Sequence, residues 1–157
     1  MTSELTGGCA CGAVRYTVAT RPLFVHCCHC RRCQRQSGAA FALNAMIEAR
    51  HIQKTQGEIE IIDTPSESGR GQLVHRCAAC KTAVWSVYAG AGSKFFFLRV
   101  GSLDDTTAMP PDIHIHTDSK QPWVILPADV PSAATFYDRK ALWPAESLAR
   151  LEAELAR

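Results

Sequence analysis

Eight cysteines among 157 residues constrain this chain more than any other feature, because they occur in close groups. The groups are Cys9 and Cys11, Cys77 and Cys80, and Cys27, Cys28, Cys30 and Cys33. The first residues carry neither the basic start nor the apolar run of a secretory signal, so we expect a cytoplasmic protein with reduced thiols. In that setting, grouped cysteines indicate metal ligation rather than a disulfide framework.

The two outer pairs have spacings that suit one tetrahedral zinc site. Zinc holds four thiolates at about 2.3 Å, which places their sulfur atoms roughly 3.8 Å apart. Cys9 and Cys11 point to the same face of an extended chain, and Cys77 and Cys80 converge through a tight turn. We therefore predict a structural zinc on these four residues. A redox role for Cys77 and Cys80 is the alternative, but no βαβ pattern surrounds the pair.

The central run predicts a second site of a different kind. Cys28, Cys30 and Cys33 offer three thiolates, and a zinc with three protein ligands keeps its fourth position for substrate, as catalytic sites do. Cys27 points the other way in an extended chain and is predicted to be a buried apolar residue, while His29 is predicted to project away from the metal. The alternative is a second structural zinc, whose fourth ligand is one of the neighbours His26, His29 and Cys27.

The rest of the chain predicts a mainly β fold with few short helices. Short runs rich in β-branched and aromatic residues alternate with glycine- and proline-containing turns. These runs cover residues 14–18, 24–27, 41–47, 59–62, 73–77, 83–89, 95–100 and 113–117. Helical signals occur over residues 30–37, closed by Gly38, and over about 144–157, where Leu148, Leu151 and Leu155 recur at helical spacing. We expect a single domain over residues 1–157, with a core from about 5 to 130 and a C-terminal helical extension.

Composition and charge exclude several classes of protein. Apolar residues make up 46% of the chain and charged residues 20%, which excludes an intrinsically disordered protein. No apolar stretch approaches the ~18 residues of a membrane span, so no membrane partner is expected. The formal charge of +2 falls to about −1 once seven thiolates and two zinc ions are counted, which leaves no broad basic surface for nucleic acid.

Several ordered motifs resemble those of the glutathione-dependent formaldehyde-activating enzyme family, whose domain is shared with centromere protein V. The resemblance covers roughly residues 5–130. It is carried by residues 7–16 (GGCACGAVRY), 28–39 (CHCRRCQRQSGA), the pair Cys77 and Cys80, residues 101–105 (GSLDD) and residues 114–123 (HIHTDSKQPW). The sequence departs from the family pattern at Lys81, where a glycine is usual, and at His116, where a tryptophan is often found.

The resemblance implies a β-rich, Mss4-like fold of small sheets around two zinc ions per chain. It assigns the structural zinc to Cys9, Cys11, Cys77 and Cys80, and it places the catalytic zinc on Cys28, Cys30 and Cys33, where the thiol of glutathione binds. The implied activity is that of a carbon–sulfur lyase, which forms or cleaves S-hydroxymethylglutathione. The alternative function is a zinc-stabilised module for protein interaction or nucleic-acid binding, without catalysis.

Five further residues are candidates for substrate binding. Arg31, Arg32 and Arg35 follow the central cysteines and are suited to bind the carboxylates of a glutathione-like ligand. His114 and His116 lie two apart in a predicted strand, so they are expected to share a face and to exchange protons near neutral pH. For each of the five, the alternative is a structural or solvated side chain with no role in binding.

Overall fold

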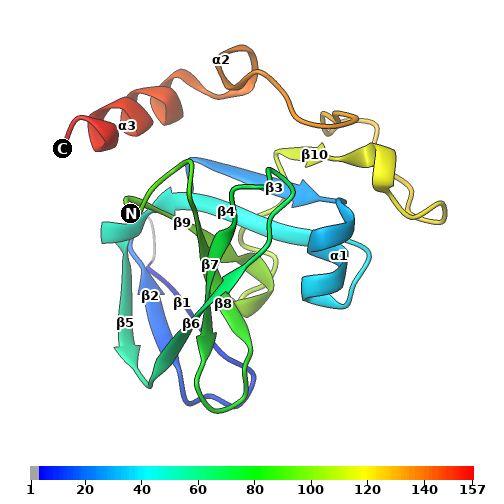
Figure 1. The fold of residues 1–157 in the computed structure, drawn as a ribbon. Helices are drawn as coiled ribbons and strands as arrows, with labels where there is room; N and C mark the ends of the chain where they lie inside the picture. Colours follow the sequence, from blue (N-terminus) through cyan, green and yellow to red (C-terminus); the bar gives the residue numbers. More distant parts are fainter. Residues whose placement is uncertain (1–3) are drawn as a thin grey trace.

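The computed structural model describes residues 4–157 and places ten strands in two sheets (Figure 1). The smaller sheet is antiparallel in the order β1–β2–β5, with β1 Leu5–Gly8, β2 Arg15–Val18 and β5 Ile52–Gln56. The larger sheet has the order β10–β3–β4–β9–β8–β7–β6. Its strands are β3 Phe24–Cys28, β4 Ala42–Glu48, β6 Ile59–Thr64, β7 Gln72–Cys77, β8 Ala83–Tyr88, β9 Phe95–Arg99 and β10 Ile113–Ile115.

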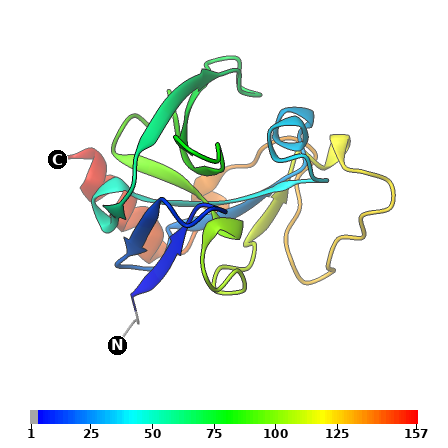
Figure 2. The same cartoon turned by 90° about the horizontal axis from the view of Figure 1, so that it is seen from below.

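Helices are short, and the first and the last lie toward opposite ends of the molecule (Figure 2). They are α1 Arg31–Ser37, α2 Arg139–Leu142 and α3 Ala145–Leu155, together with the 3-10 turns Ala49–His51, Val100–Ser102 and Thr117–Ser119. Within residues 4–157, the mainly β prediction and the C-terminal helix are therefore confirmed. α1 begins directly after Cys30 and ends where Gly38 takes a left-handed conformation (φ 67°), as its sequence predicts.

Strand β4 separates two hydrophobic cores, because its residues alternate between the faces of the larger sheet. Ala45 and Ile47 belong to the core shared with the smaller sheet, where Tyr16 and Trp85 also pack. Met46 belongs to the second core, which lies under residues 133–157, here called the C-terminal segment. The two layers explain why β4 is buried almost throughout, although an antiparallel strand at a surface would be buried on one face only.

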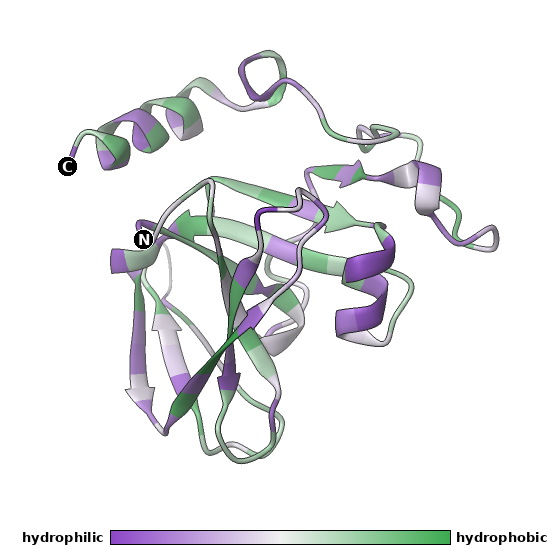
Figure 3. Cartoon of the chain, in the orientation of Figure 1, coloured by the Kyte–Doolittle hydropathy of each residue, from purple (hydrophilic) through white to green (hydrophobic). Residues whose placement is uncertain are grey.

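The C-terminal segment crosses the larger sheet on the side of β3 and β4 (Figure 1). Trp143 and Leu151 are buried there, and polar residues alternate with apolar ones along α3 (Figure 3). Leu148 packs against the same core, whereas Leu155 keeps 54% of its surface exposed. Glu48 at the end of β4 fixes the helix, since its carboxylate accepts hydrogen bonds of 3.0 and 2.7 Å from Arg150.

Two strands are absent from the sequence prediction, and each has a physical reason. β1 contains Gly7 and Gly8, which weaken any strand signal. A Cβ at Gly7 would lie 2.6 Å from the carbonyl oxygen of Ser102 and would also collide with Tyr16, so the sheet requires glycine there. β5 has four exposed polar residues after Ile52 and lies at the edge of the smaller sheet, so its sequence lacks the alternation of apolar and polar residues that marks a strand.

Candidate functional site

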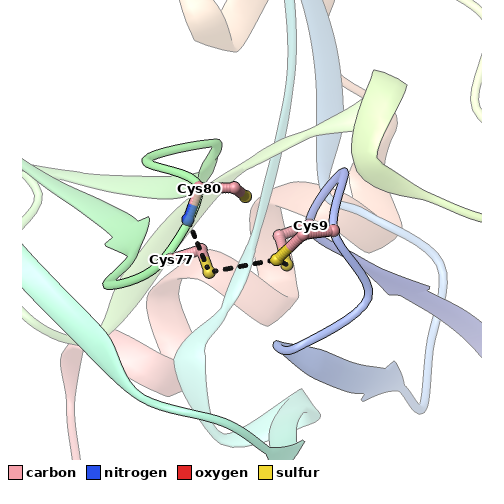
Figure 4. Close-up of side chains that lie close together, drawn as sticks. Cys9, Cys77 and Cys80 are labelled. Atoms are coloured by element: carbon pink, nitrogen blue, oxygen red, sulfur yellow. Dashed lines mark hydrogen bonds between the residues drawn. The ribbon is translucent and has the colours of Figure 1, made fainter.

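The first candidate metal group consists of Cys9, Cys11, Cys77 and Cys80, here called the four-thiol group. Figure 4 shows Cys77, the last residue of β7, and Cys80, from the turn that follows, facing Cys9, from the loop after β1. The Sγ atoms of Cys9 and Cys11 are 3.5 Å apart, those of Cys11 and Cys77 are 3.9 Å apart, and all four sulfurs lie within 4.8 Å of one another. These separations fit the roughly 3.8 Å expected between thiolates around a tetrahedral zinc.

Backbone and hydroxyl donors lie close to three of these sulfurs, those of Cys9, Cys77 and Cys80. The N–H of Val14 donates to Cys9 Sγ at 3.2 Å, and the N–H of Cys80 lies 3.5 Å from Cys77 Sγ. The hydroxyl of Thr82, 3.1 Å from Cys80 Sγ, together with nearby backbone N–H groups lowers the pKa of Cys80 to about 5. The four-thiol group is therefore suited to a cation, because donors of this kind favour the thiolate.

Lys81 closes the turn of the second cysteine pair with a positive φ of 65°. This is the position where the family pattern has glycine, and a left-handed conformation is unfavourable for a residue with a Cβ. Its N–H donates to the carbonyl of Cys77 at 2.9 Å, and its ammonium group contacts Glu60 at 2.8 Å. The chain thus keeps the turn geometry without the glycine.

The second candidate metal group, here called the thiol triad, consists of Cys28, Cys30 and Cys33. Cys28 ends β3, Cys30 caps the N-terminus of α1, and Cys33 lies in its first turn. Their sulfurs lie within 4.8 Å of one another, and all three residues are buried. In the part of the chain that the structure describes, no fourth cysteine, histidine or carboxylate joins them.

Negative charge in the thiol triad concentrates on Cys30. The thiols of Cys28 and Cys33 donate to its sulfur, as does the backbone N–H of Cys33 at 3.4 Å, and together they lower the pKa of Cys30 to about 2. The same contact with Cys30 raises the pKa of Cys28. A buried thiolate among buried thiols calls for a compensating cation, which makes the triad a fitting site for a soft metal ion.

A cavity of about 510 Å³ opens against the thiol triad, and all three of its cysteines border it. Most of its lining is apolar, and a large share comes from the C-terminal segment. Phe136, Tyr137 and Trp143, here called the aromatic wall, stand along one side. A ligand can therefore approach the three sulfurs from the cavity, where no side chain of the protein fills the space.

His26 connects β3 to the aromatic wall. Trp143 Nε1 donates to the Tyr137 hydroxyl at 2.8 Å, which leaves the hydroxyl proton of Tyr137 for His26 Nε2 at 2.6 Å. Burial lowers the pKa of His26 to about 4, so the ring is neutral at physiological pH. Within residues 4–157, His26 Nδ1 has no hydrogen-bond partner, and the residue borders the cavity.

The predicted arginines reach the cavity unequally. Arg32 borders it and lies 3.9 Å from Glu67, whereas Arg31 and Arg35 are exposed on α1 and do not border it. Sequence reasoning missed Arg70 and Arg139, which also border the cavity. Neither is near the cysteines in sequence, so only the fold brings them to the site.

The two predicted histidines do not share a face. β10 ends at Ile115, and His116 takes a left-handed conformation (φ 55°) that turns the chain toward the cavity, which His116 borders. His114 stays inside the sheet and is 6% exposed. The expected alternation fails because the extended backbone on which it depends stops one residue before His116.

His114 forms a buried group with His29 and Cys27. His29 Nε2 lies 2.9 Å from His114 Nδ1 and 3.7 Å from Cys27 Sγ. The outer ring nitrogens, His29 Nδ1 and His114 Nε2, have no partner within residues 4–157, although metal-bound histidines normally donate that N–H to a neighbour. We interpret this group as a hydrogen-bonded pair of neutral histidines, because burial lowers the pKa of His29 to about 4 and also lowers the pKa of His114. His29 is fully buried and not solvent-facing, and Cys27 is buried as predicted.

Comparison with known proteins identifies the family. The family model described as glutathione-dependent formaldehyde-activating enzyme matches residues 4–119, nearly three quarters of the chain. The chain belongs to this family. A Halomonas elongata protein provisionally described as a glutathione-dependent formaldehyde-activating enzyme is 28% identical over 131 residues, which cover 76% of this chain and 79% of that protein.

One solved structure is also similar. The crystal structure of a Rhodobacter sphaeroides protein aligns with 82% of this chain and 99% of its own, at 15% identity and a TM-score of 0.49. Among the described residues, no helix has the length and apolar character needed to cross a membrane.

Proposed function

We propose that the protein is a zinc-dependent carbon–sulfur lyase acting on the adduct of a glutathione-type thiol with an aldehyde, such as S-hydroxymethylglutathione. The observation that supports this most directly is the thiol triad, whose three buried sulfurs face a cavity of about 510 Å³ and have no fourth protein ligand among residues 4–157. Catalytic zinc sites keep three protein ligands and one exchangeable position, whereas structural sites have four.

Two zinc ions per chain match the two groups of thiols. The four-thiol group would hold a structural ion, and Cys28, Cys30 and Cys33 would hold a second, exchangeable one. A zinc ion in the triad supplies a Lewis acid that favours the deprotonated form of a substrate thiol. All eight cysteines are free of disulfides, which suits the reducing cytoplasm that we propose as the compartment.

The residues around the cavity bind and orient the adduct. Arg32, Arg70 and Arg139 border the cavity and are suited to the two carboxylates of glutathione, while Arg31 and Arg35 add positive charge on the exposed side of α1. His114 has no access to the cavity, so its role is to hold His29 in the sheet beside the triad.

Cleavage of the adduct needs one proton acceptor. The carbon–sulfur bond breaks with its electron pair going to sulfur, the hydroxyl oxygen becomes the aldehyde oxygen, and the hydroxyl proton leaves. His116 borders the cavity beside the triad and is placed to take this proton, and it returns the proton to the oxygen when the adduct forms. The products are a thiolate and a free aldehyde.

The test measures exchange between glutathione plus formaldehyde and S-hydroxymethylglutathione by NMR, together with the zinc content. We expect the wild type to bind two zinc ions and to accelerate exchange. Cys33→Ser should stay folded with one tightly held zinc and lose the acceleration, because it removes a ligand only from the exchangeable site. Cys80→Ser should lose much of its folded structure, since closed sites contribute directly to folding.

Cys27→Ala is the matched control, because Cys27 is a buried cysteine of the same segment that does not border the cavity. This variant should keep both zinc ions and most of the rate. The proposal fails if Cys33→Ser exchanges as fast as the wild type. It also fails if that variant unfolds as completely as Cys80→Ser, and the protein is then better described as a zinc-stabilised binding module.

A further inference from the structure

The aromatic wall lies outside the part of the chain that defines the family. The family match ends at residue 119, whereas Phe136, Tyr137 and Trp143 come from the segment between β10 and α3. This segment brings apolar surface to the same cavity that exposes the thiol triad. The thiols thus come from the part of the chain that the family model matches, whereas this aromatic part of the cavity lining comes from beyond it.

The aromatic wall is ordered by its own contacts and still leaves apolar surface open. Trp143 stacks on Phe24 with ring centroids 5.3 Å apart, and Phe136 stacks on Tyr137 at 4.8 Å. Phe136 nevertheless keeps 59% of its surface exposed. Leu155, which also borders the cavity, keeps 54% exposed. Large apolar side chains left exposed around a concave site mark a place where a ligand binds.

The polarity of the cavity lining sets the kind of group that packs against the aromatic wall. Formaldehyde adds a single carbon to its thiol, which covers little of an exposed ring such as that of Phe136 at this cavity. Glutathione itself is rich in carboxylate, ammonium and amide groups, which cost free energy against an apolar wall without hydrogen bonds. Those polar groups match Arg32 and Arg70 instead, which border the cavity, whereas Arg139 lies over the ring of Trp143 with its guanidinium carbon 5.5 Å from the centroid.

From this division of the cavity we propose that the aldehyde part of the substrate is aromatic or similarly bulky and apolar, so that the adduct is a thiohemiacetal of an aryl aldehyde. This rests on the proposed lyase function and narrows its substrate. The thiol part lies toward Arg32 and Arg70 with its sulfur at the triad, and the aryl group packs on the aromatic wall. Cleavage then releases the thiolate and the aryl aldehyde, and the hydroxyl proton passes to His116.

Binding of two stable glutathione thioethers tests this assignment without depending on catalysis. S-benzylglutathione carries an aryl group on sulfur and S-methylglutathione carries one carbon, and isothermal titration to the zinc-loaded protein compares their dissociation constants. We expect the benzyl compound to bind at least about tenfold more tightly, as burial of a phenyl group predicts. Equal affinities for the two thioethers would overturn the substrate assignment.

Variants locate the effect on the aromatic wall. Phe136→Ala should fold normally, because the side chain is largely exposed, and should lose most of the preference for the benzyl compound, whereas Phe136→Leu should retain much of it. Ile125→Ala is the control, since Ile125 is 91% exposed and does not border the cavity. If Phe136→Ala keeps the full preference, the aryl group does not occupy the aromatic wall and the inference is wrong.

Rates separate this inference from the function on which it rests. Exchange of glutathione with benzaldehyde and with formaldehyde is followed by NMR in the same samples, and we expect the larger acceleration for benzaldehyde. Acceleration of formaldehyde exchange alone keeps the lyase function and refutes the aryl substrate. No acceleration of either, with no binding of glutathione or its thioethers, refutes both.

Discussion

The ion pair between Glu48 and Arg150 makes an asymmetric prediction about stability. Glu48 is 1% exposed at the end of β4, while the side chain of Arg150 on α3 is 23% exposed and also donates to the carbonyl of Arg21 at 3.0 Å. Arg150→Ala leaves a buried carboxylate without a partner, which should lower the free energy of unfolding by about 3 kcal/mol. Glu48→Gln keeps the shape and leaves a guanidinium that water can reach, so the expected loss is about 1 kcal/mol.

The same pair predicts how pH changes this difference. Burial raises the pKa of Glu48, but the hydrogen bonds and the positive charge of Arg150, together with the backbone N–H of Glu48 itself, outweigh burial and hold the pKa below its ordinary value. A lowered folded pKa gives stability that is present above the unfolded pKa of about 4.3 and lost only below it, so the wild-type contribution is constant from pH 8 to 5. Without Arg150, burial leaves the pKa of Glu48 raised. The free energy of unfolding of Arg150→Ala should therefore approach that of the wild type as pH falls through that raised pKa.

Urea unfolding of the wild type and of Arg150→Ala, at the same buffered free zinc concentration between pH 8 and 5, measures the gap between their free energies of unfolding. Protonation of the zinc ligands weakens both proteins alike and cancels in the difference. The gap should narrow by up to about 1.4 kcal/mol per pH unit below the raised pKa. A gap that is independent of pH, or an equal loss in Arg150→Ala and Glu48→Gln, would contradict the burial argument.

Two substitutions test backbone geometry. Lys81→Gly should raise the free energy of unfolding by about 0.5 kcal/mol in urea, because relief of the positive φ outweighs the loss of the exposed ion pair with Glu60. Lys81→Ala is the control, since it loses the same ion pair but keeps the Cβ. This variant should not be more stable than the wild type. Gly7→Ala should cost about 2 kcal/mol in the same assay, because its Cβ meets the carbonyl of Ser102 at 2.6 Å, whereas Gly101→Ala, with open space around it, should be near neutral.

Sequence patterns predicted local features well. Turn glycines and alternating apolar residues located most strands, and Gly38 marked the end of α1, because these signals depend on neighbours within a few residues. The cysteine spacings likewise indicated which sulfurs converge, since C-x-C and C-x-x-C are local geometries. The approach of the Cys9 pair to the Cys77 pair was inferable because four thiols complete one tetrahedral site.

Features that depend on distant segments could not be read in this way. The cavity joins Cys28, at the end of β3, to Phe136 and Arg139, more than a hundred residues later, and no spacing rule connects them. His116 failed as a strand residue because its left-handed backbone is set by the turn that follows β10, not by the alternation before it. The buried pairing of His29 with His114 equally required the parallel contact of β3 with β10.

The four-thiol group takes one cysteine pair from a loop of the smaller sheet and the other from a turn of the larger sheet. With zinc as the ion, this arrangement is a removable crosslink between segments 66 residues apart. Bound metal stabilises the native chain by mass action, by about 2.7 kcal/mol at a free concentration one hundred times the dissociation constant. The folded population would then follow the free concentration of the metal, and removal of the metal would open the chain to proteolysis through its unfolded form.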